Sequence, residues 1–489
     1  MNFIDRVMGW LGYSRVAGVT GNTRNSMTVL QETNIAAYFR LLWAYYENNA
    51  LYDATTVAVR NFETGGERVL SLRNPANSVV EFYAATVCPG PLDAALPIVA
   101  AREPVAAAIR QIWGWSNWGE NKQVAIRQFA AYGNVFIKVA QRTDGSPYLQ
   151  IIRPDTVTAI EQDERGNLTY ARIDTPIADG NSTLTRTEIW TREEMRMWVH
   201  ALGDASEAQL GTPSNRVATA DLGIDFVPIA HGRFKSTGSI YGASAYVHTL
   251  DKIDMLNRYA WRLGRMLFGS KSIWAILTNS VDKDGRPLPA VSLKSPDGRA
   301  DINIADAERD MMIRLPGASD LKSVVPALPY ADVLAVVEAT DQALERDLPE
   351  MRYWRVIESA TSGAEVERRL APAISRAREA RGNFEAVLIR AHMMALTIGA
   401  KANIFKGIGT FENGDFEHSF EERAILPSDA LDIAQLVAAR ATAGQLPHLQ
   451  RWRELGFSDE QITQLSAERE AELEQSARML LTDQIVGVR

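Results

Sequence analysis

The sequence has few of the residues and motifs on which metal, disulfide or nucleophile chemistry depends. Its one cysteine, Cys88, excludes an internal disulfide and is expected to be a small buried side chain, which fits a reducing, cytoplasmic setting. The six histidines are scattered, with no His-x-x-x-His pair, so a zinc site is not expected. The motifs Gly-x-x-x-x-Gly-Lys-Ser/Thr and Gly-x-Ser-x-Gly are absent, which argues against a P-loop and a nucleophile elbow. We therefore expect no metal, no cofactor and no enzymatic activity.

Long apolar runs and a surplus of positive charge are also lacking. No window reaches the roughly 18 apolar residues that a membrane span needs, and Asp5 and Arg6 interrupt the apolar residues near the N-terminus. We expect a soluble protein with no membrane partner and no classical signal peptide. The net charge of -8 and the pI near 5.5 argue against a protein that grips DNA over a basic face. A protein that contacts DNA without holding it is still allowed.

What is present is a mixture of helical and strand patterns over 489 residues, a length that predicts more than one core. Helical periodicity covers 27–50 and, around a Trp-rich turn, 105–133, where Gly133 is expected to end the second helix. A period of two follows, which predicts an α+β domain over about the first 240 residues. The predicted strands are "NVFIKVAQ" and "PYLQIIR", joined by a turn at Asp144 and Gly145, then "TVTAIEQ", "LTYARID" and "RTEIWTREEMRMWVH".

Two long helices are predicted on either side of a small β-containing module. The first covers 243–268, about 37 Å at 1.5 Å per residue, and the second begins near Tyr330. Between them, "KSIWAILTN" and "RDMMIRLPG" are strand candidates and 281–303 is loop-like. The chain after residue 427 is predicted to be helical, with Ser428 and Ser458 as N-caps and Gln461 completing a capping box with Ser458.

The stretch "LPEMRYWRVIESATSGAEVERRL" interrupts this helical pattern with aromatic, basic and small polar residues. We interpret it as a loop between the second long helix and a further long helix that begins in "SGAEVERRL".

The order of these parts resembles that of the portal proteins of tailed bacteriophages, in particular the SPP1-like branch. The stretches that carry the resemblance are "FAAYGNVFIKV", "VPIAHGRFK" before "YGASAY", "LPGASDLKSVVPAL" and "SATSGAEVERRL". Each stretch alone has low specificity. Their order and spacing cover essentially the whole chain.

The resemblance implies a portal fold that assembles as a homo-oligomeric ring, usually a dodecamer, at one capsid vertex of a virion assembled in the host cytoplasm. Double-stranded DNA would pass through the ring, without sequence specificity, during genome packaging and ejection. The implied partners of this head-tail connector are the terminase large subunit, a head-completion adaptor, and the major capsid and scaffolding proteins. Carried onto this chain, 1–242 and 364–426 correspond to the wing, 243–268 and 329–349 to two stem helices, 269–328 to the clip, 350–363 to the tunnel loop and 427–489 to the helical crown.

A channel through which DNA slides cannot hold phosphates strongly, because each neutralised phosphate adds affinity. Net negative charge repeated around a ring gives a repulsive background. In the tunnel loop, Arg352 and Arg355 are the candidates for transient phosphate contacts. Tyr353 and Trp354 either face the channel or pack onto a neighbouring subunit. The other candidate site residues are Glu358, Ser359 and Thr361 in the loop, and Asp251, Lys252, Asp254, Arg258, Arg262, Asp341 and Glu345 in the stem.

Two other classes of protein remain open from the sequence. A metal-dependent nuclease could be built on scattered carboxylates, and it would be a monomer or small oligomer with metal-dependent turnover. Another adaptor component of the same virion is the third possibility, although two long helices around a clip-like module are not expected there.

Overall fold

The protein is described by a computed structural model. Among the helices that it describes, none combines the length and the hydropathy of a membrane-spanning segment. The described residues are 34–48, 73–179, 182–201, 216–269, 273–278, 319–324, 330–359, 363–405, 416–426, 448–455, 461–469 and a few isolated positions between them.

The chain divides into two compact units, which are described separately. The larger consists of Met1–Arg68, Asn74–Ile253 and Ala343–Arg489, and the smaller of Val69–Arg73 and Asp254–Gln342. Two helices, α10 (Leu250–Gly269) and α11 (Tyr330–Asp347), have residues in both units.

The first helices of the larger unit pack around aromatic side chains. The Asn34 side chain accepts a 3.0 Å hydrogen bond from the backbone N of Ala37, which satisfies a donor at the start of the helix Ile35–Glu47 that has no partner within the helix. Phe129 lies 5.3 Å from Phe234 and 5.7 Å from Phe384, ring centre to ring centre, so one aromatic cluster joins distant segments. These helices are α3 (Ile35–Glu47), α5 (Pro75–Thr86), α6 (Leu92–Ala95), α7 (Glu103–Trp115) and α8 (Trp118–Tyr132).

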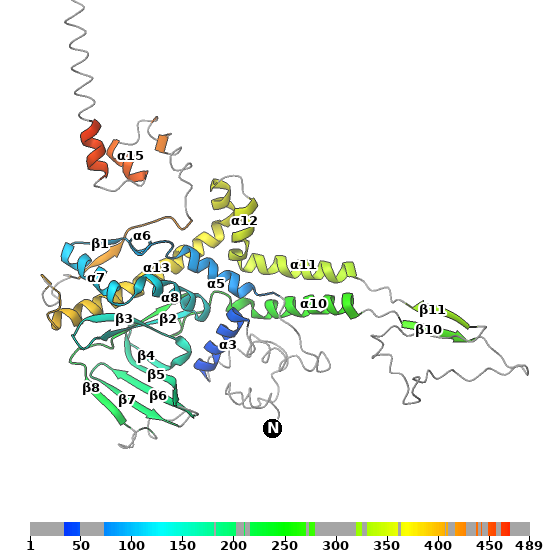
Figure 1. The fold of residues 1–489 in the computed structure, drawn as a ribbon, viewed down its shortest axis with the longest axis horizontal. Coiled ribbons are helices and arrows are strands. Elements are labelled where there is room, and N and C mark those ends of the chain that lie inside the picture. Colours follow the sequence, from blue (N-terminus) through cyan, green and yellow to red (C-terminus); the bar gives the residue numbers. More distant parts are fainter. Residues whose placement is uncertain are drawn as a thin grey trace, which may run out of the picture. The chain divides into compact units, whose positions relative to one another are not determined.

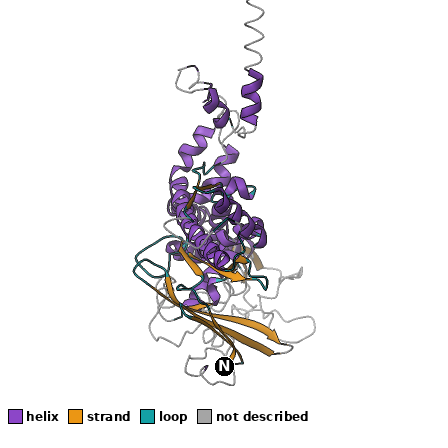
Figure 2. Ribbon diagram, turned by 90° about the vertical axis from the view of Figure 1, so that its left-hand side faces the viewer, coloured by secondary structure: helices purple, strands orange, loops and turns teal. Residues whose placement is uncertain are grey.

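Among the described residues of the larger unit, the strands form three antiparallel sheets (Figure 1, Figure 2). One has the order β3-β2-β9, another is a five-stranded meander from β4 to β8, and β1 pairs with β12. The strands are β1 (Ile98–Ala100), β2 (Asn134–Gln141), β3 (Pro147–Ile152), β4 (Val157–Gln162), β5 (Leu168–Asp179), β6 (Ser182–Thr191), β7 (Glu194–His200), β8 (Arg216–Asp221), β9 (Ile229–Arg233) and β12 (His418–Phe420).

The core of the β part lies between the three-stranded and five-stranded sheets. Phe136 of β2 packs there with Ile160, Ile173 and Trp190 of the meander, and all four are buried. The helix α13 (Gly363–Lys401) packs against β9, β3 and β2. Its fully buried residues include Phe384 and Leu388, so this long helix and the sheet share apolar surface.

The smaller unit contains the two-stranded sheet of β10 (Ile273–Thr278) and β11 (Ser319–Val324), which are antiparallel. Asn257 of α10 joins the segment before α5 to this unit. Its side-chain Oδ1 accepts a 2.8 Å hydrogen bond from Arg73 N, and its Nδ2 donates one of 3.0 Å to Arg73 O.

Several sequence predictions are confirmed by these elements. The mixed α+β class, the helix pair within 105–133, the hairpin of β2 and β3, and the start of α11 at Tyr330 all hold. Gly133 ends α8 with φ of 76°, and Cys88 is fully buried. The helix predicted over 27–50 is observed at Ile35–Glu47.

The first predicted stem helix is wrong at its start, because α10 begins at Leu250 and not at 243. The backbone before it is held by other segments. Ala243 N donates to Lys235 O at 3.0 Å and Ala245 N to Ala130 O at 3.0 Å, so these amides are not available for a helix. A short 3-10 turn, Val247–Thr249, leads into α10.

Three further predictions need correction. The segment "RTEIWTREEMRMWVH" forms two strands, β6 and β7, which pair across the turn at Arg192 and Glu193. Strand β11 was not predicted, and the loop of 350–363 is largely helical, as described below. The predicted strand "RDMMIRLPG", the loop 281–303, and the capping residues Ser428 and Ser458 lie outside the described residues.

Candidate functional site

The residues predicted to form a tunnel loop lie mainly on two short helices. A 3-10 turn, Pro349–Arg352, runs directly into α12 (Tyr353–Ser359). Tyr353 and Val356 of this segment are buried, as is Leu348 directly before it, and the burial of these side chains explains why the segment is not an open loop. Thr361 lies outside the described residues.

Arg352 and Arg355 share one carboxylate, that of Glu345 near the end of α11. Arg352 Nε lies 3.3 Å from Glu345 Oε2, and Arg355 donates to Glu345 Oε1. The Glu345 side chain is 12% exposed, whereas that of Arg355 is 63% exposed. The sequence placed Glu345 in the stem and the arginines in the loop, and the structure brings all three together.

A second carboxylate, Glu350, is buried with 1% of its surface exposed. It accepts a 2.7 Å hydrogen bond from the Tyr83 hydroxyl and lies 3.4 Å from Arg376 NH1. Arg376 also donates to Asp347 O at 2.8 Å. Burial, followed by the charge of Glu350, raises the pKa of Tyr83 well above its usual value, so the hydroxyl remains a donor. Sequence reasoning missed Tyr83, Glu350 and Arg376, and no local pattern marks them.

The two neighbouring aromatic residues of α12 have different surroundings. Tyr353 is buried, and its ring lies 5.2 Å from that of Phe82 in α5, at 73°. This ring therefore packs inside its own chain. Trp354 is 53% exposed and Ile357, one turn further on, is 45% exposed. The exposed apolar pair on α12 is thus Trp354 and Ile357.

The remaining residues of α12 are polar and exposed. Ser359 Oγ donates to Arg355 O at 2.8 Å and accepts a 3.1 Å hydrogen bond from Arg369 NH1 of α13. Glu358 is exposed.

The predicted stem residues are divided between the two units. In the larger unit, Lys252 at the start of α10 forms an ion pair with Asp347 at the end of α11. In the smaller unit, Asp341 lies 3.7 Å from Arg73 NH1. Asp254 is 6% exposed, so it does not present its carboxylate to solvent in this chain. Asp251 and Arg258 are half-buried on α10, and Arg262 is on the same helix with a side chain outside the described residues.

Around the end of α11, cations and carboxylates of the larger unit are almost balanced. The ion-paired cations are Lys252, Arg352, Arg355 and Arg376, and the ion-paired carboxylates are Glu345, Asp347 and Glu350. Among these paired groups, one formal positive charge is in excess. Because Arg352 and Arg355 are already paired within the chain, a phosphate would have to compete with Glu345 for them.

Two histidines that are distant in the sequence meet in the core of the larger unit. Trp113 Nε1 donates to His392 Nε2 at 2.9 Å, His392 Nδ1 lies 3.1 Å from His418 Nε2, and His418 Nδ1 lies 2.8 Å from Phe416 O. Each hydrogen bond in this series has one donor and one acceptor when both imidazole rings are neutral and each carries its proton on Nδ1. Burial lowers the pKa of His392 well below its usual value and also lowers that of His418. The pair therefore has a structural role, as uncharged polar core.

Comparisons with known proteins identify structural similarity only. No protein-family model matches the chain, and no curated protein matches it. Solved structures of gene transfer agent particles are similar: a chain of the virion of the native particle has 16% identity and a TM-score of 0.40, over 82% of this chain and 93% of that one. A chain from the neck of the native particle, computed with C12 symmetry, has 17% identity and a TM-score of 0.41, over 82% and 93%.

Proposed function

We propose that this chain is a portal protein of a tailed bacteriophage or of a phage-like particle. Copies of it form a ring at one vertex of the capsid, through which double-stranded DNA enters during packaging and leaves during ejection. In this proposal 269–328 forms the clip, and its region 281–303 docks the terminase large subunit and later the head-completion adaptor. The ring also contacts the major capsid and scaffolding proteins.

One observation carries the proposal, namely the order of elements from α10 to α13. Helix α10 is followed by the β10–β11 pair, then by α11, the short helix α12 and the 39-residue helix α13. This is the order that the sequence resemblance to portal proteins implies. The start of α10 and the end of α11 are joined by the ion pair of Lys252 and Asp347, as expected for the base of a stem.

The arrangement of charges at the α11–α12 junction favours transport of DNA through the ring over tight retention of DNA. Arg352 and Arg355 offer guanidinium groups whose charge is shared with Glu345. Weak, replaceable contacts of this kind let a duplex advance, since affinity for phosphates grows with each neutralised charge. The chain as a whole has a net charge of -8.

The nuclease alternative has no assembled site in the described part of the chain. There, no three side chains among His, Cys, Asp and Glu lie close enough together to hold a metal ion. The other alternative is an adaptor role. A packaging assay distinguishes this role from the portal role more sharply than the oligomeric state does.

Native mass spectrometry and electron-micrograph class averages of the full chain at moderate salt test the proposal. We expect closed rings of twelve or thirteen copies with an open axial channel. If the purified chain is a monomer or dimer, the same measurements are repeated with the scaffolding protein from its own genome. A chain that remains monomeric with scaffold and cleaves DNA with Mg²⁺ would overturn the portal proposal in favour of the nuclease.

A further inference from the structure

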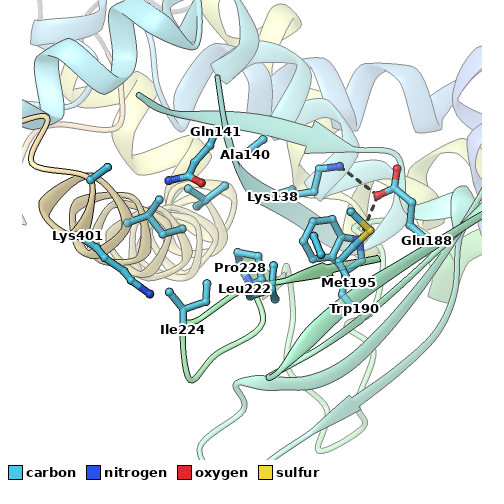
Figure 3. Close-up of a pocket in the computed structure, with 14 residues that line it drawn as sticks. Lys138, Ala140, Gln141, Glu188, Trp190, Met195, Leu222, Ile224, Pro228 and Lys401 are labelled. Atoms are coloured by element: carbon cyan, nitrogen blue, oxygen red, sulfur yellow. Dashed lines mark hydrogen bonds and ion pairs between the residues drawn. The ribbon is translucent and has the colours of Figure 1, made fainter. Parts of the chain in front are cut away.

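A pocket of about 510 Å³ lies within the larger unit, between β2, the β6–β8 side of the meander and the end of α13. Its size is that of a small-molecule site. Figure 3 shows Lys401 at one end, Trp190 with Lys138 and Glu188 at the other, and apolar side chains such as Ile224 and Leu222 between them. The pocket is distinct from the cluster at the α11–α12 junction and does not depend on the proposed function.

At the end with Trp190, the two charged residues that line the pocket are Lys138 and Glu188, which carry opposite charges. Lys138 Nζ lies 3.2 Å from Glu188 Oε2 and 5.3 Å from the centre of the Trp190 ring. Trp190 Nε1 donates to the same carboxylate at 3.1 Å. The Lys138 and Glu188 side chains are only 12% and 8% exposed, so they form a nearly buried ion pair. The other oxygen of Glu188, Oε1, lies 3.2 Å from Nε of Arg186, which is outside the pocket lining. A ligand group at this end needs no charge and gains by burying apolar surface against Trp190 and Met195.

The end with Lys401 carries a positive charge. Lys401 is the last residue of α13, and its ammonium group donates to the backbone oxygen of Gly223. Among the described residues, no carboxylate forms an ion pair with it, and an ammonium group has two further N–H donors. Between the two ends most of the lining is apolar, including Val139, Ala140 and Ile398, and Gln141 adds one amide group.

From this distribution of charge we infer that the pocket binds a small apolar monocarboxylate, with its carboxylate at Lys401 and its apolar tail directed toward Trp190. An apolar cation is disfavoured by Lys401, and a short acid without a tail leaves the apolar lining unused. The occupant is a free small acid such as a medium-chain fatty acid.

Isothermal titration calorimetry with hexanoate, octanoate and decanoate, each below its micelle concentration, tests the inference on the full chain. We expect one site per chain and an affinity that rises up to about fourfold for each added CH₂ group. Acetate and decylamine are expected to bind at least tenfold more weakly than decanoate. Equal binding of decanoate and decylamine would overturn the inference.

Two variants assign the binding to this pocket. Lys401→Glu is expected to reverse the preference, so that decylamine binds more tightly than decanoate, while the exposed Lys235→Glu leaves it unchanged. Ala220→Trp, on the pocket side of the edge strand β8, is expected to abolish decanoate binding by filling the pocket. Unchanged decanoate affinity in both Lys401→Glu and Ala220→Trp, with melting temperatures like that of the parent protein, would show that the acid binds elsewhere.

Discussion

The hydroxyl of Tyr83 in α5 donates a 2.7 Å hydrogen bond to Oε1 of Glu350, across 267 residues of chain. Both residues are almost completely buried. Since a buried carboxylate is costly unless it is bonded, this contact and Arg376 together stabilise the turn between α11 and α12. The turn is thereby fixed to α5 of the same chain and is not left to be ordered by a neighbour.

Removal of the Tyr83 hydroxyl tests that relationship. Tyr83→Phe keeps the ring but takes one donor from Glu350, so the free energy of unfolding in urea is expected to fall by about 1–2 kcal/mol. Tyr148→Phe is the matched control. Tyr148 is only half-buried, and its replacement is expected to change the free energy by less than about 0.5 kcal/mol. Equal losses in the two variants would contradict the role given to the Tyr83–Glu350 bond.

The two arginines that share Glu345 yield a prediction that rests on the proposed function. The double variant Arg352→Ala and Arg355→Ala is expected to lower DNA packaging without disrupting the ring, because the groups nearest to passing phosphates are removed. The measurement is packaged DNA per particle, with ring integrity checked by electron microscopy. Arg110→Ala, an exposed arginine paired with Glu103, is the control. Normal packaging by the double variant would rule out the contact with DNA.

The Glu345→Gln variant tests the same cluster in the opposite direction. Loss of this carboxylate frees the guanidinium groups of Arg352 and Arg355, so retention of duplex DNA by the assembled ring is expected to increase. The slope of log affinity against log salt is expected to steepen by about 1. Binding assays at several salt concentrations measure both effects. An unchanged slope would mean that the arginines do not reach phosphates.

Burial of His231 predicts a loss of stability in acid. Its ring stacks on Phe136 at 4.5 Å, accepts a 2.7 Å bond from Gln162 Nε2 and donates to Asn134 Oδ1 at 3.0 Å. Burial, with Arg233 and Arg390 nearby, lowers the pKa of His231 from 6.5 to about 3. Between these pH values the unfolded chain binds a proton that the folded chain does not. The free energy of unfolding is therefore expected to fall by about 1.4 kcal/mol per pH unit below 6.5 from this residue alone.

A comparison of variants isolates the His231 contribution from that of other acid-sensitive groups. His231→Gln is neutral at every pH, so its urea midpoints between pH 7 and pH 4.5 are expected to fall less steeply than those of the parent protein. The contributions of His392 and His418 are present in both proteins and cancel. Parallel curves would contradict the assignment.

The backbone of Ala243 and Ser244 lies so close to Gly133 that one added methyl group is expected to destabilise the fold strongly. Gly133 has φ of 76°, and a Cβ there would lie 2.5 Å from Ala243 C and from Ser244 N. Gly133→Ala is expected to destabilise the fold by more than about 3 kcal/mol, because strain in the left-handed region is added to a clash with backbone. Gly114→Ala, inside α7 with nothing within 4 Å of its Cβ, is expected to be neutral or stabilising by up to about 1 kcal/mol. Melting temperatures of the two variants measure the difference.

The sequence by itself determined the type and order of most elements, because periodicity and turn residues act locally. The pair α7 and α8 with Gly133, the hairpin of β2 and β3, and the start of α11 follow from residues close in the chain. Local rules failed where long-range contacts compete. The segment 243–249 has a helical pattern, but its backbone is bound to Lys235 and Ala130, and the predicted loop became α12 because Val356 and Tyr353 find buried surface.

The candidate site was predictable only in part, for the same reason. The sequence pointed to Arg352 and Arg355 by their place between two helices, yet their pairing with Glu345 depends on how α12 folds back on α11. Tyr83, Glu350 and Arg376, the His392–His418 pair, and the pocket between Lys401 and Trp190 all join residues far apart in sequence. Only the tertiary structure decided these contacts, because burial and charge pairing depend on distances in space that no spacing along the chain specifies.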